Sequence, residues 1–198
     1  PGSELPVTGL AFDPAKAKSL LAEAGIDPNS FSFTLSYGVE GDNERVVTVL
    51  QSMWQENLGI SVTLEALELS TFSSRLNDTY QDPATGLQAY YSIWGADYPD
   101  PQNFLSLQLQ TGVGFNNGHW SNPEFDRLTK EADTTVDDFA KRAKLYNQAE
   151  QIAVTEVGWL PLFNAKVNVL IRQCIKGIEV TGMDFLIPNW SALAGCPS

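Results

Sequence analysis

The sequence is short of basic residues. It has 12 Lys and Arg against 24 Asp and Glu, which gives a formal net charge of −12 over 198 residues. Proteins that bind nucleic acids or anionic membranes use Lys and Arg to do so, and this balance therefore argues against both kinds of partner. The acidic excess permits a cationic ligand, although its commonest role is to keep a protein soluble.

Cysteine and long apolar runs are also scarce. The two cysteines, Cys174 and Cys196, cannot alone form the usual four-ligand zinc site. They fit either one disulfide, which an exported protein would allow, or two separate thiols. No apolar run approaches the roughly 20 residues of a membrane-spanning helix. The chain opens without a signal peptide on a loop-like stretch, as we expect of a sequence that starts within a longer protein.

Common catalytic motifs are missing as well. The one histidine, His119, lies in a Gly- and Asn-rich loop, where a solvated or hydrogen-bonding role is commoner than that of a general base. The sequence has no serine-hydrolase elbow, zinc-protease motif or phosphate-binding loop. The glycines at 112 and 114 lack the third glycine of a dinucleotide-binding turn. We therefore predict a protein that is not an enzyme and holds no cofactor or metal.

Hydrophobic periodicity predicts alternating helices and strands in the first half of the chain. The predicted elements are helices at 13–24 and 46–58, strands at 31–37, 60–64 and 87–94, and a short helix that Ser70 and Thr71 would cap. A strand, a long helix and a strand in succession form a βαβ unit, so the first two strands should be parallel. The third predicted strand has apolar residues on both faces, as a central strand would.

The second half is predicted to be helical and then extended. The pattern indicates a short helix at 103–110, a helix that starts near Ser121, a helix capped by Asp137, and strands at 159–163 and 167–171. The tail from Gly177 is weakly patterned. Because no repeat or internal linker is evident, we expect residues 1–198 to form a single α/β domain.

Residues 90–101 combine a buried strand with a constrained loop. An aromatic run reaches a Trp-Gly pair and then meets two prolines, which cannot continue a strand. Asp97 would thus lie just beyond a strand end, where ligands of α/β proteins gather. A carboxylate there needs a ligand cation, an arginine or backbone amides to offset its desolvation.

Asp100 and the tryptophans are weaker candidates. Asp97 and Asp100 together could act as the paired acids of a glycoside hydrolase, but three-residue spacing across prolines is unspecific. We favour a turn or helix-capping role for Asp100. Most tryptophans lie in cores, and Trp94 is the candidate for a binding role because of its position.

Five segments resemble, in order, the oligopeptide-, dipeptide- and nickel-binding family of extracytoplasmic solute-binding proteins of ABC importers. They are FDPAKAKSLLAEAG at 12–25, LGISV at 58–62, WGADYPDP at 94–101, SNPEFD at 121–126 and LPLF at 160–163. The resemblance spans about residues 12–180. It implies the C-terminal lobe of a two-lobe, periplasmic-binding-protein-like molecule, with a mixed, mostly parallel sheet flanked by helices and with the N-terminal lobe absent from this chain.

The resemblance also implies a function. Family members bind peptides or other solutes between two lobes and deliver them to the permease of an ABC importer. A periplasmic or cell-surface location follows, and a lipid anchor through the missing N-terminal part is compatible with it. In peptide-binding members the aspartate of the W-x-x-D run holds the peptide α-amino group, and the backbone before it pairs with the peptide as an added strand.

Carried over by residue, the ligand-binding residues would be Ser92, Trp94, Gly95 and Asp97. Some peptide binders have an arginine three residues before this tryptophan. Tyr91 stands there in this chain, which weakens the expectation of a charged contact with a peptide C-terminus.

Two alternatives stay open. A different solute, such as an oligosaccharide stacked on Trp94 or Trp120, would suit a receptor of the same family. The alternative from another class is a hydrolase that uses Asp97 and Asp100.

Overall fold

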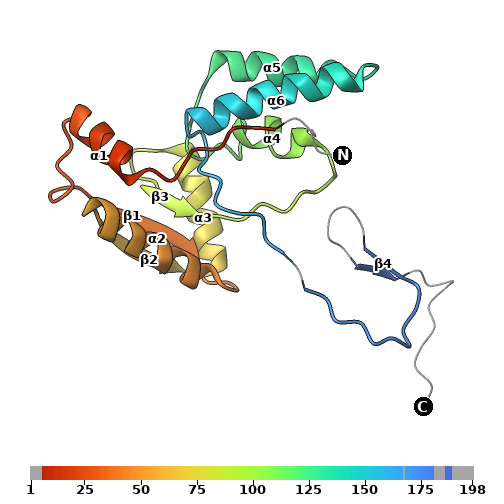
Figure 1. The fold of residues 1–198 in the computed structure, drawn as a ribbon, viewed down its shortest axis with the longest axis horizontal. Coiled ribbons are helices and arrows are strands. Elements are labelled where there is room, and N and C mark those ends of the chain that lie inside the picture. Colours follow the sequence, from red (N-terminus) through yellow and green to blue (C-terminus); the bar gives the residue numbers. More distant parts are fainter. Residues whose placement is uncertain (1–5, 167, 181–185, 189–198) are drawn as a thin grey trace.

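A computed structural model describes residues 6–166, 168–180 and 186–188. Its centre is a parallel sheet with strand order β2-β1-β3, surrounded by three helices and followed by a helical unit (Figure 1). The strands of the sheet are β1 (Ser32–Gly38), β2 (Ser61–Leu67) and β3 (Ala89–Tyr91), and the helices around it are α1 (Pro14–Glu23), α2 (Asn43–Leu58) and α3 (Leu69–Gln81). The later elements are η1 (Pro101–Asn103), α4 (Ser106–Leu109), α5 (Pro123–Thr134), α6 (Phe139–Thr155), β4 (Ile178–Val180) and β5 (Leu186–Pro188).

Helices α2 and α3 cover opposite faces of the sheet. Leu35 and Tyr37 point from β1 into a core with Val47 of α2. The intervening Ser36 points the other way, and its hydroxyl donates to Glu65, which pairs with Arg75 of α3. This alternation is the period-two pattern of a strand, and the predicted parallel pairing of β1 and β2 is confirmed.

Two of the predicted helix caps are wrong by a few residues. Helix α3 is capped by Glu68, whose carboxylate accepts from the backbone N–H groups of Ser70 and Thr71, because a glutamate side chain is long enough to reach them. Helix α6 is capped by Asp138 rather than Asp137, since Asp138 Oδ1 lies 2.8 Å from the nitrogen of Lys141.

The strand predicted at 87–94 is shorter than expected and lies at an edge. Only Ala89–Tyr91 pair with β1, which is the central strand of the three. Just before β3, a side chain and not the backbone bonds to β1: the Oε1 atom of Gln88 accepts from the backbone N–H of Thr34 at 2.8 Å. After β3 the chain turns away, so that residues 92–94 are not in the sheet.

A second core lies in the helical unit. Phe125, Leu128 and Tyr146 are buried between α5 and α6, and Leu105 and Leu109 from the α4 region pack against them. This core is separate from the one beneath the sheet. The chain from 92 to 104 runs from the sheet to the helical unit, and the loop at 111–120 touches both.

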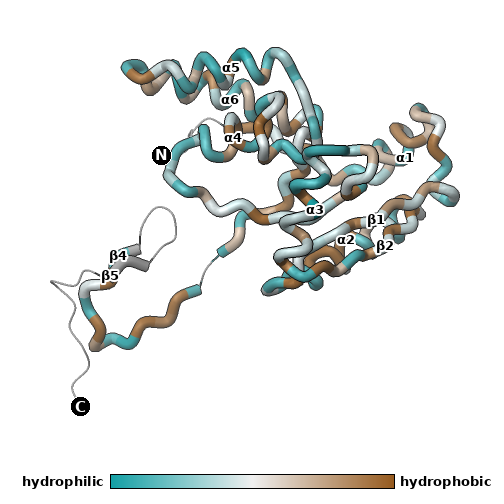
Figure 2. Tube along the Cα trace, turned by 180° about the vertical axis from the view of Figure 1, so that it is seen from behind, coloured by the Kyte–Doolittle hydropathy of each residue, from teal (hydrophilic) through white to brown (hydrophobic). Residues whose placement is uncertain are grey.

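The predicted strands at 159–163 and 167–171 are wrong for the described residues. Residues 159–166 and 168–171 run away from the helical unit without a strand partner among the residues that the structure describes (Figures 1 and 2). Leu160, Phe163 and Leu170 are exposed there. An alternating apolar pattern becomes a strand only when a neighbouring backbone pairs with it. Residue 167 of the second predicted strand lies outside the described part.

The remaining predictions concern the two cysteines and the absence of a membrane-spanning helix. Cys174 is disulfide-bonded, whereas Cys196 lies outside the described residues. Among the described helices, none combines the length and the apolar character needed to cross a bilayer.

Close packing at Gly86 gives a test of the fold. A Cβ atom there would lie 2.7 Å from the Cα of Thr79 in α3, so we expect Gly86→Ala to lower the free energy of unfolding by about 1–3 kcal/mol. Gly114→Ala is the control, since its Cβ would meet nothing within 4 Å and the change should stay within about 0.5 kcal/mol. Urea unfolding measures both, and equal effects would contradict the packing described.

Candidate functional site

The buried side chain of Asn103 joins two predicted site residues. Its Oδ1 accepts from the indole Nε1 of Trp94 at 2.7 Å and from the backbone nitrogen of Asp97 at 3.2 Å. Its Nδ2 donates to Asp97 Oδ2 at 3.3 Å. Asn103 has no solvent exposure, so these bonds are shielded from competition by water. Trp94 and Asp97 are therefore both hydrogen-bonded to the side-chain amide of Asn103.

Asp97 itself is exposed and lies in a loop, not directly at the end of β3. No lysine or arginine of the described residues pairs with it, and its carboxylate accepts only from the neutral Asn103 amide. Neither of the protein partners expected for this carboxylate, an arginine or a set of backbone amides, is found in the described part of the chain. The carboxylate is free to receive a cation from solution.

Trp94, which shares the Asn103 amide with Asp97, is also one member of an aromatic pair. The rings of Trp94 and Phe115 are 5.1 Å apart at an interplanar angle of 60°. Trp94 is half-buried, but Phe115 is 47% exposed although it is a large apolar side chain. An exposed aromatic supported from behind by a second ring provides a surface for an apolar group.

The backbone between β3 and Asp97 is open. Residues 92–96 make no backbone–backbone hydrogen bond with any described residue, and Ser92 and Gly95 are exposed. A Cβ atom at Gly95 would meet nothing within 4 Å. Because β3 is an edge strand, one side of its backbone has no strand partner among the described strands.

Asp100 is occupied by structural bonds. Its Oδ1 accepts from the backbone nitrogen of Gln102, and its two oxygens accept from Arg142 at 2.6 and 2.8 Å. The hydrogen bonds from Arg142 hold the pKa of Asp100 below its ordinary value. The capping role predicted for Asp100 is confirmed, and a carboxylate held ionised in this way is a poor proton donor for hydrolysis.

The other aromatic and catalytic candidates lie to the side of this cluster. His119 is exposed, and its ring stacks on Tyr80 with 5.4 Å between centroids. Trp120 packs edge-on against Phe125 of the helical core. Within the described ranges, no group of three or more His, Cys, Asp and Glu side chains is placed to hold a metal ion.

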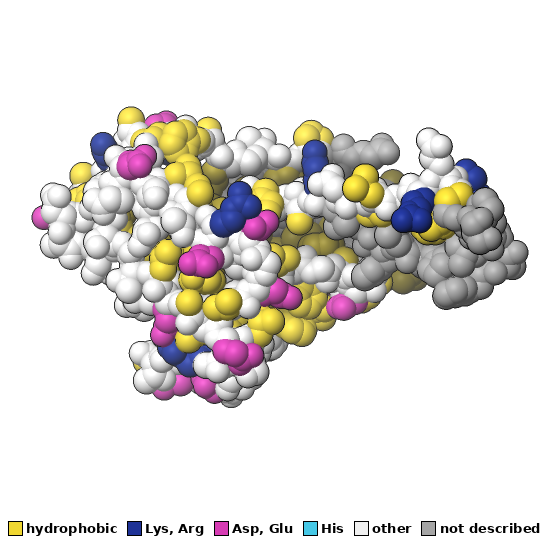
Figure 3. Space-filling model, turned by 90° about the horizontal axis from the view of Figure 1, so that it is seen from below, with side chains coloured by type: hydrophobic (Ala, Val, Ile, Leu, Met, Phe, Trp, Pro, Cys, Tyr) yellow, Lys and Arg dark blue, Asp and Glu magenta, His cyan; other side chains and the backbone are white. Residues whose placement is uncertain are grey.

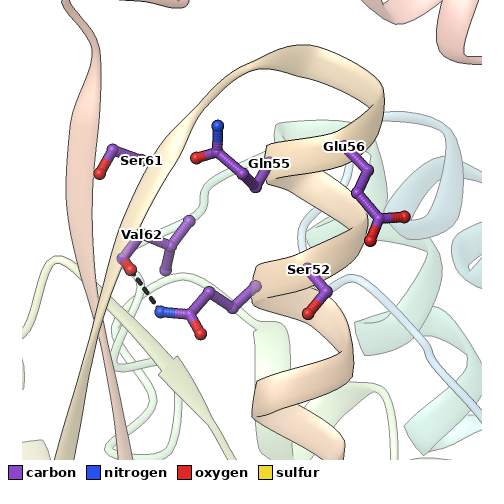
Figure 4. A pocket seen from close by; sticks show the side chains of 6 residues that line it. Ser52, Gln55, Glu56, Ser61 and Val62 are labelled. Carbon is purple, nitrogen blue, oxygen red and sulfur yellow. Dashed lines mark hydrogen bonds between the residues drawn. The ribbon is translucent and has the colours of Figure 1, made fainter.

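A separate hollow of about 350 Å³ lies between α2 and β2 (Figure 4). Its lining includes Gln51, Glu56 and Ser61, and the Gln51 amide crosses it to donate to the backbone oxygen of Val62 at 2.7 Å. Since β2 and β3 flank β1, this polar hollow is at the opposite edge of the sheet from the loop that carries Asp97.

Sequence reasoning missed three residues of the site. Asn103 was assigned to a helix start, although a polar residue directly after the Asp-Pro turn could have drawn attention. Phe115 is the one aromatic in the loop at 111–118, a signal that was available. Arg142 is 42 positions from Asp100, and no local pattern relates the two.

Comparison with known proteins places the chain in a well-populated group. A family model described as bacterial extracellular solute-binding proteins, family 5 Middle, matches residues 1–116. The chain is 30% identical over 167 residues to the periplasmic murein peptide-binding protein MppA of Escherichia coli K12. It is 31% identical over 167 residues to the probable deoxycholate-binding periplasmic protein YgiS of the same organism. Each match covers 84% of this chain.

The fold agrees with these relatives. The chain aligns with OppA of Burkholderia pseudomallei at a TM-score of 0.75 and 29% identity, over 89% of this chain and 35% of that one. The chain spans only 30% of the length of the two curated relatives.

The Asp100–Arg142 pair gives a test of what holds the loop. Arg142 is 19% and Asp100 30% exposed, so Arg142→Met should cost about 1–3 kcal/mol of unfolding free energy. Arg45→Met is the control, because Arg45 and Asp42 are 82% and 75% exposed and such pairs contribute less than about 1 kcal/mol.

The pH dependence has a definite sign. The pKa of Asp100 is lowered in the folded state, so its contribution is present above the ordinary value of 3.8 and is lost as the pH falls through the lowered folded value. The stability gap between wild type and Arg142→Met should be constant from about pH 7 to 5 and close below about pH 4. A gap that widens in acid would contradict this assignment.

Proposed function

The chain belongs to the bacterial extracellular solute-binding proteins of family 5, and on this basis we propose that it is part of a peptide receptor of an ABC importer. The receptor would close two lobes around a peptide and deliver it to a membrane permease. MppA is named for binding a murein peptide, and a further relative is the oligopeptide-binding protein OppA of Bacillus subtilis. The single observation that carries the proposal is the exposed Asp97 carboxylate, which no described cation neutralises.

A peptide offers the groups that this surface can accept. Its α-ammonium would meet Asp97, and its first apolar side chain would lie against Trp94 and Phe115. Its backbone would pair with the open edge at Ser92–Gly95, in the manner of an added strand. The net charge of −12 favours approach of a cationic group.

Another solute is the second candidate, and one observation favours it. YgiS is named as a probable deoxycholate-binding protein, and a largely apolar ligand would suit the exposed face of Phe115. A deoxycholate carboxylate would not suit Asp97, however, because like charges repel. An oligosaccharide has less support, since Trp120 is half-buried against Phe125. The hydrolase is disfavoured because Asp100 is committed to Arg142.

We propose that the receptor works outside the cytoplasm, as the periplasmic relatives do, and that a permease receives its ligand. We also propose that residues 1–198 form the C-terminal lobe and that the other wall of the cleft belongs to the remainder of the protein. The part of the relatives' length that this chain does not span is large enough to supply a second lobe.

The apolar segment 159–171, with residue 167 outside the described part, supports this division. It extends from the helical unit with Leu160, Leu162, Phe163, Leu170 and Ile171 exposed, and Figure 3 shows further apolar side chains uncovered on the underside of the molecule. An extended apolar segment without a partner strand is unfavourable in water. We propose that it pairs with the second lobe in the whole protein.

The isolated chain should therefore self-associate through this segment. In sedimentation velocity, the chain at tens of micromolar should form concentration-dependent oligomers, and Phe163→Lys combined with Leu170→Lys should shift it to monomer. Phe139→Lys, at an apolar residue that is 78% exposed on α6, is the control and should leave the association unchanged. A chain that is monomeric before any substitution would contradict the proposal.

The role of Asp97 is tested in the full-length protein. We expect Asp97→Asn to weaken binding of free-amine oligoleucine peptides by about 10- to 100-fold, because a charge-assisted hydrogen bond is lost. Asp137→Asn removes the same charge at an exposed position on the α5–α6 turn and serves as the control. Titration calorimetry measures affinity, and mass spectrometry follows the peptide. Peptide turnover that depends on both Asp97 and Asp100 would overturn the receptor assignment.

A further inference from the structure

We propose that Asn103 is a positioning residue that makes the carboxylate of Asp97 and the Trp94–Phe115 aromatic pair recognise a ligand as one unit. The ligand class that follows is a primary ammonium with an apolar group on the adjacent carbon, as at the N-terminus of a peptide that begins with an apolar residue. This inference rests on the proposed function and adds to it the residue that sets the selectivity.

The first argument is the hydrogen-bond pattern of the Asn103 side chain. Its oxygen faces two donors, the indole of Trp94 and the backbone N–H of Asp97, and its NH₂ group faces an acceptor, Asp97 Oδ2. Turning the amide over would place NH₂ against two N–H groups and the oxygen against a carboxylate. One orientation alone satisfies all three partners, so the amide fixes both site residues at once.

The second argument is that Asn103 cannot itself move easily. It is fully buried, and its backbone nitrogen donates to the backbone oxygen of Asp100 at 3.1 Å. Asp100 caps the same turn and is anchored to Arg142, which also donates to the backbone oxygen of Ala132. The turn that carries Asn103 is thus fixed to the helical core.

The third argument concerns which carboxylate oxygen is left for a ligand. Asn103 Nδ2 occupies Asp97 Oδ2, while no described residue donates to Oδ1. The indole N–H of Trp94 is already bonded to Asn103, so the Trp94 ring offers its face and not its donor to a ligand held at Asp97. The amide therefore separates the polar and apolar halves of the recognition surface.

The test measures a selectivity ratio in the full-length protein. Oligoleucine peptides of two to five residues are titrated with a free and with an acetylated amine. Wild type should prefer the free amine by about 10- to 100-fold. In Asn103→Ala and in the similarly sized Asn103→Leu, this ratio should fall to less than about threefold, because Asp97 is no longer oriented.

Gln102→Ala is the matched control. Gln102 lies in the same turn, but its side chain contacts Tyr98 and neither of the site residues, so the ratio should be unchanged. Thermal unfolding is recorded for every variant, since a purely structural role of Asn103 would lower the melting temperature without changing the ratio. A folded Asn103 variant that keeps the wild-type ratio would overturn the inference and leave the proposed function intact.

A second measurement uses the unaltered protein, in case neither variant folds. With ¹⁵N-labelled asparagine, the side-chain NH₂ signals of Asn103 should shift on adding the free-amine peptide and stay in place with the acetylated one. Equal shifts with both peptides would overturn the inference. Wild type that binds neither peptide, or both equally, would overturn the proposed anchor at Asp97 together with the inference.

Discussion

The ion pair between Asp100 and Arg142 is the contact on which the candidate site depends. It joins the first turn after the sheet to a helix 42 residues further along the chain, and both carboxylate oxygens take part. Arg142 also donates to the hydroxyl of Tyr146 and to the backbone oxygen of Ala132, so its guanidinium has little freedom. A bidentate pair of this kind fixes direction as well as distance. The loop between β3 and η1 is long and rich in exposed residues, and this ion pair is its one salt bridge to the helical unit among the described residues.

The two hydrophobic cores explain why such an anchor is needed. One core lies between the sheet and α2, the other among α4, α5 and α6, and they share no buried residue among those described. The loop that carries Trp94 and Asp97 passes from one to the other, and Phe115 reaches it from the loop at 111–118. A site between two separate cores can combine side chains from both, and its geometry depends on how the connecting loop is anchored to each of them.

Much of the fold follows from the sequence, because its signals are local. Pro14 after Asp13, Gly59 at the end of α2 and the alternation in β1 each act within a few residues, and the elements they predict are found. The errors have a different origin. The strand expected at 87–94 pairs with β1 only as far as Tyr91, and Trp94 lies beyond it with its indole bonded to Asn103. The strands expected at 159–171 are unpaired in the described part of that segment. Trp94 and Asp97 were identified through a motif, whereas Asn103 and Arg142 act through contacts that only the folded chain creates.

The two edges of the sheet differ in how readily the strand of another molecule can pair with them. In β2, Leu67 presents its carbonyl to β1, where Val39 bonds to it, so by the alternation of a strand the Val62 carbonyl faces outward. The Gln51 side chain covers that outward oxygen. A second chain that approaches β2 finds its first acceptor already taken, while the edge at β3 and Ser92 stays available. Strand addition is therefore less favourable at β2, where one outward acceptor is covered, than at the open edge of β3.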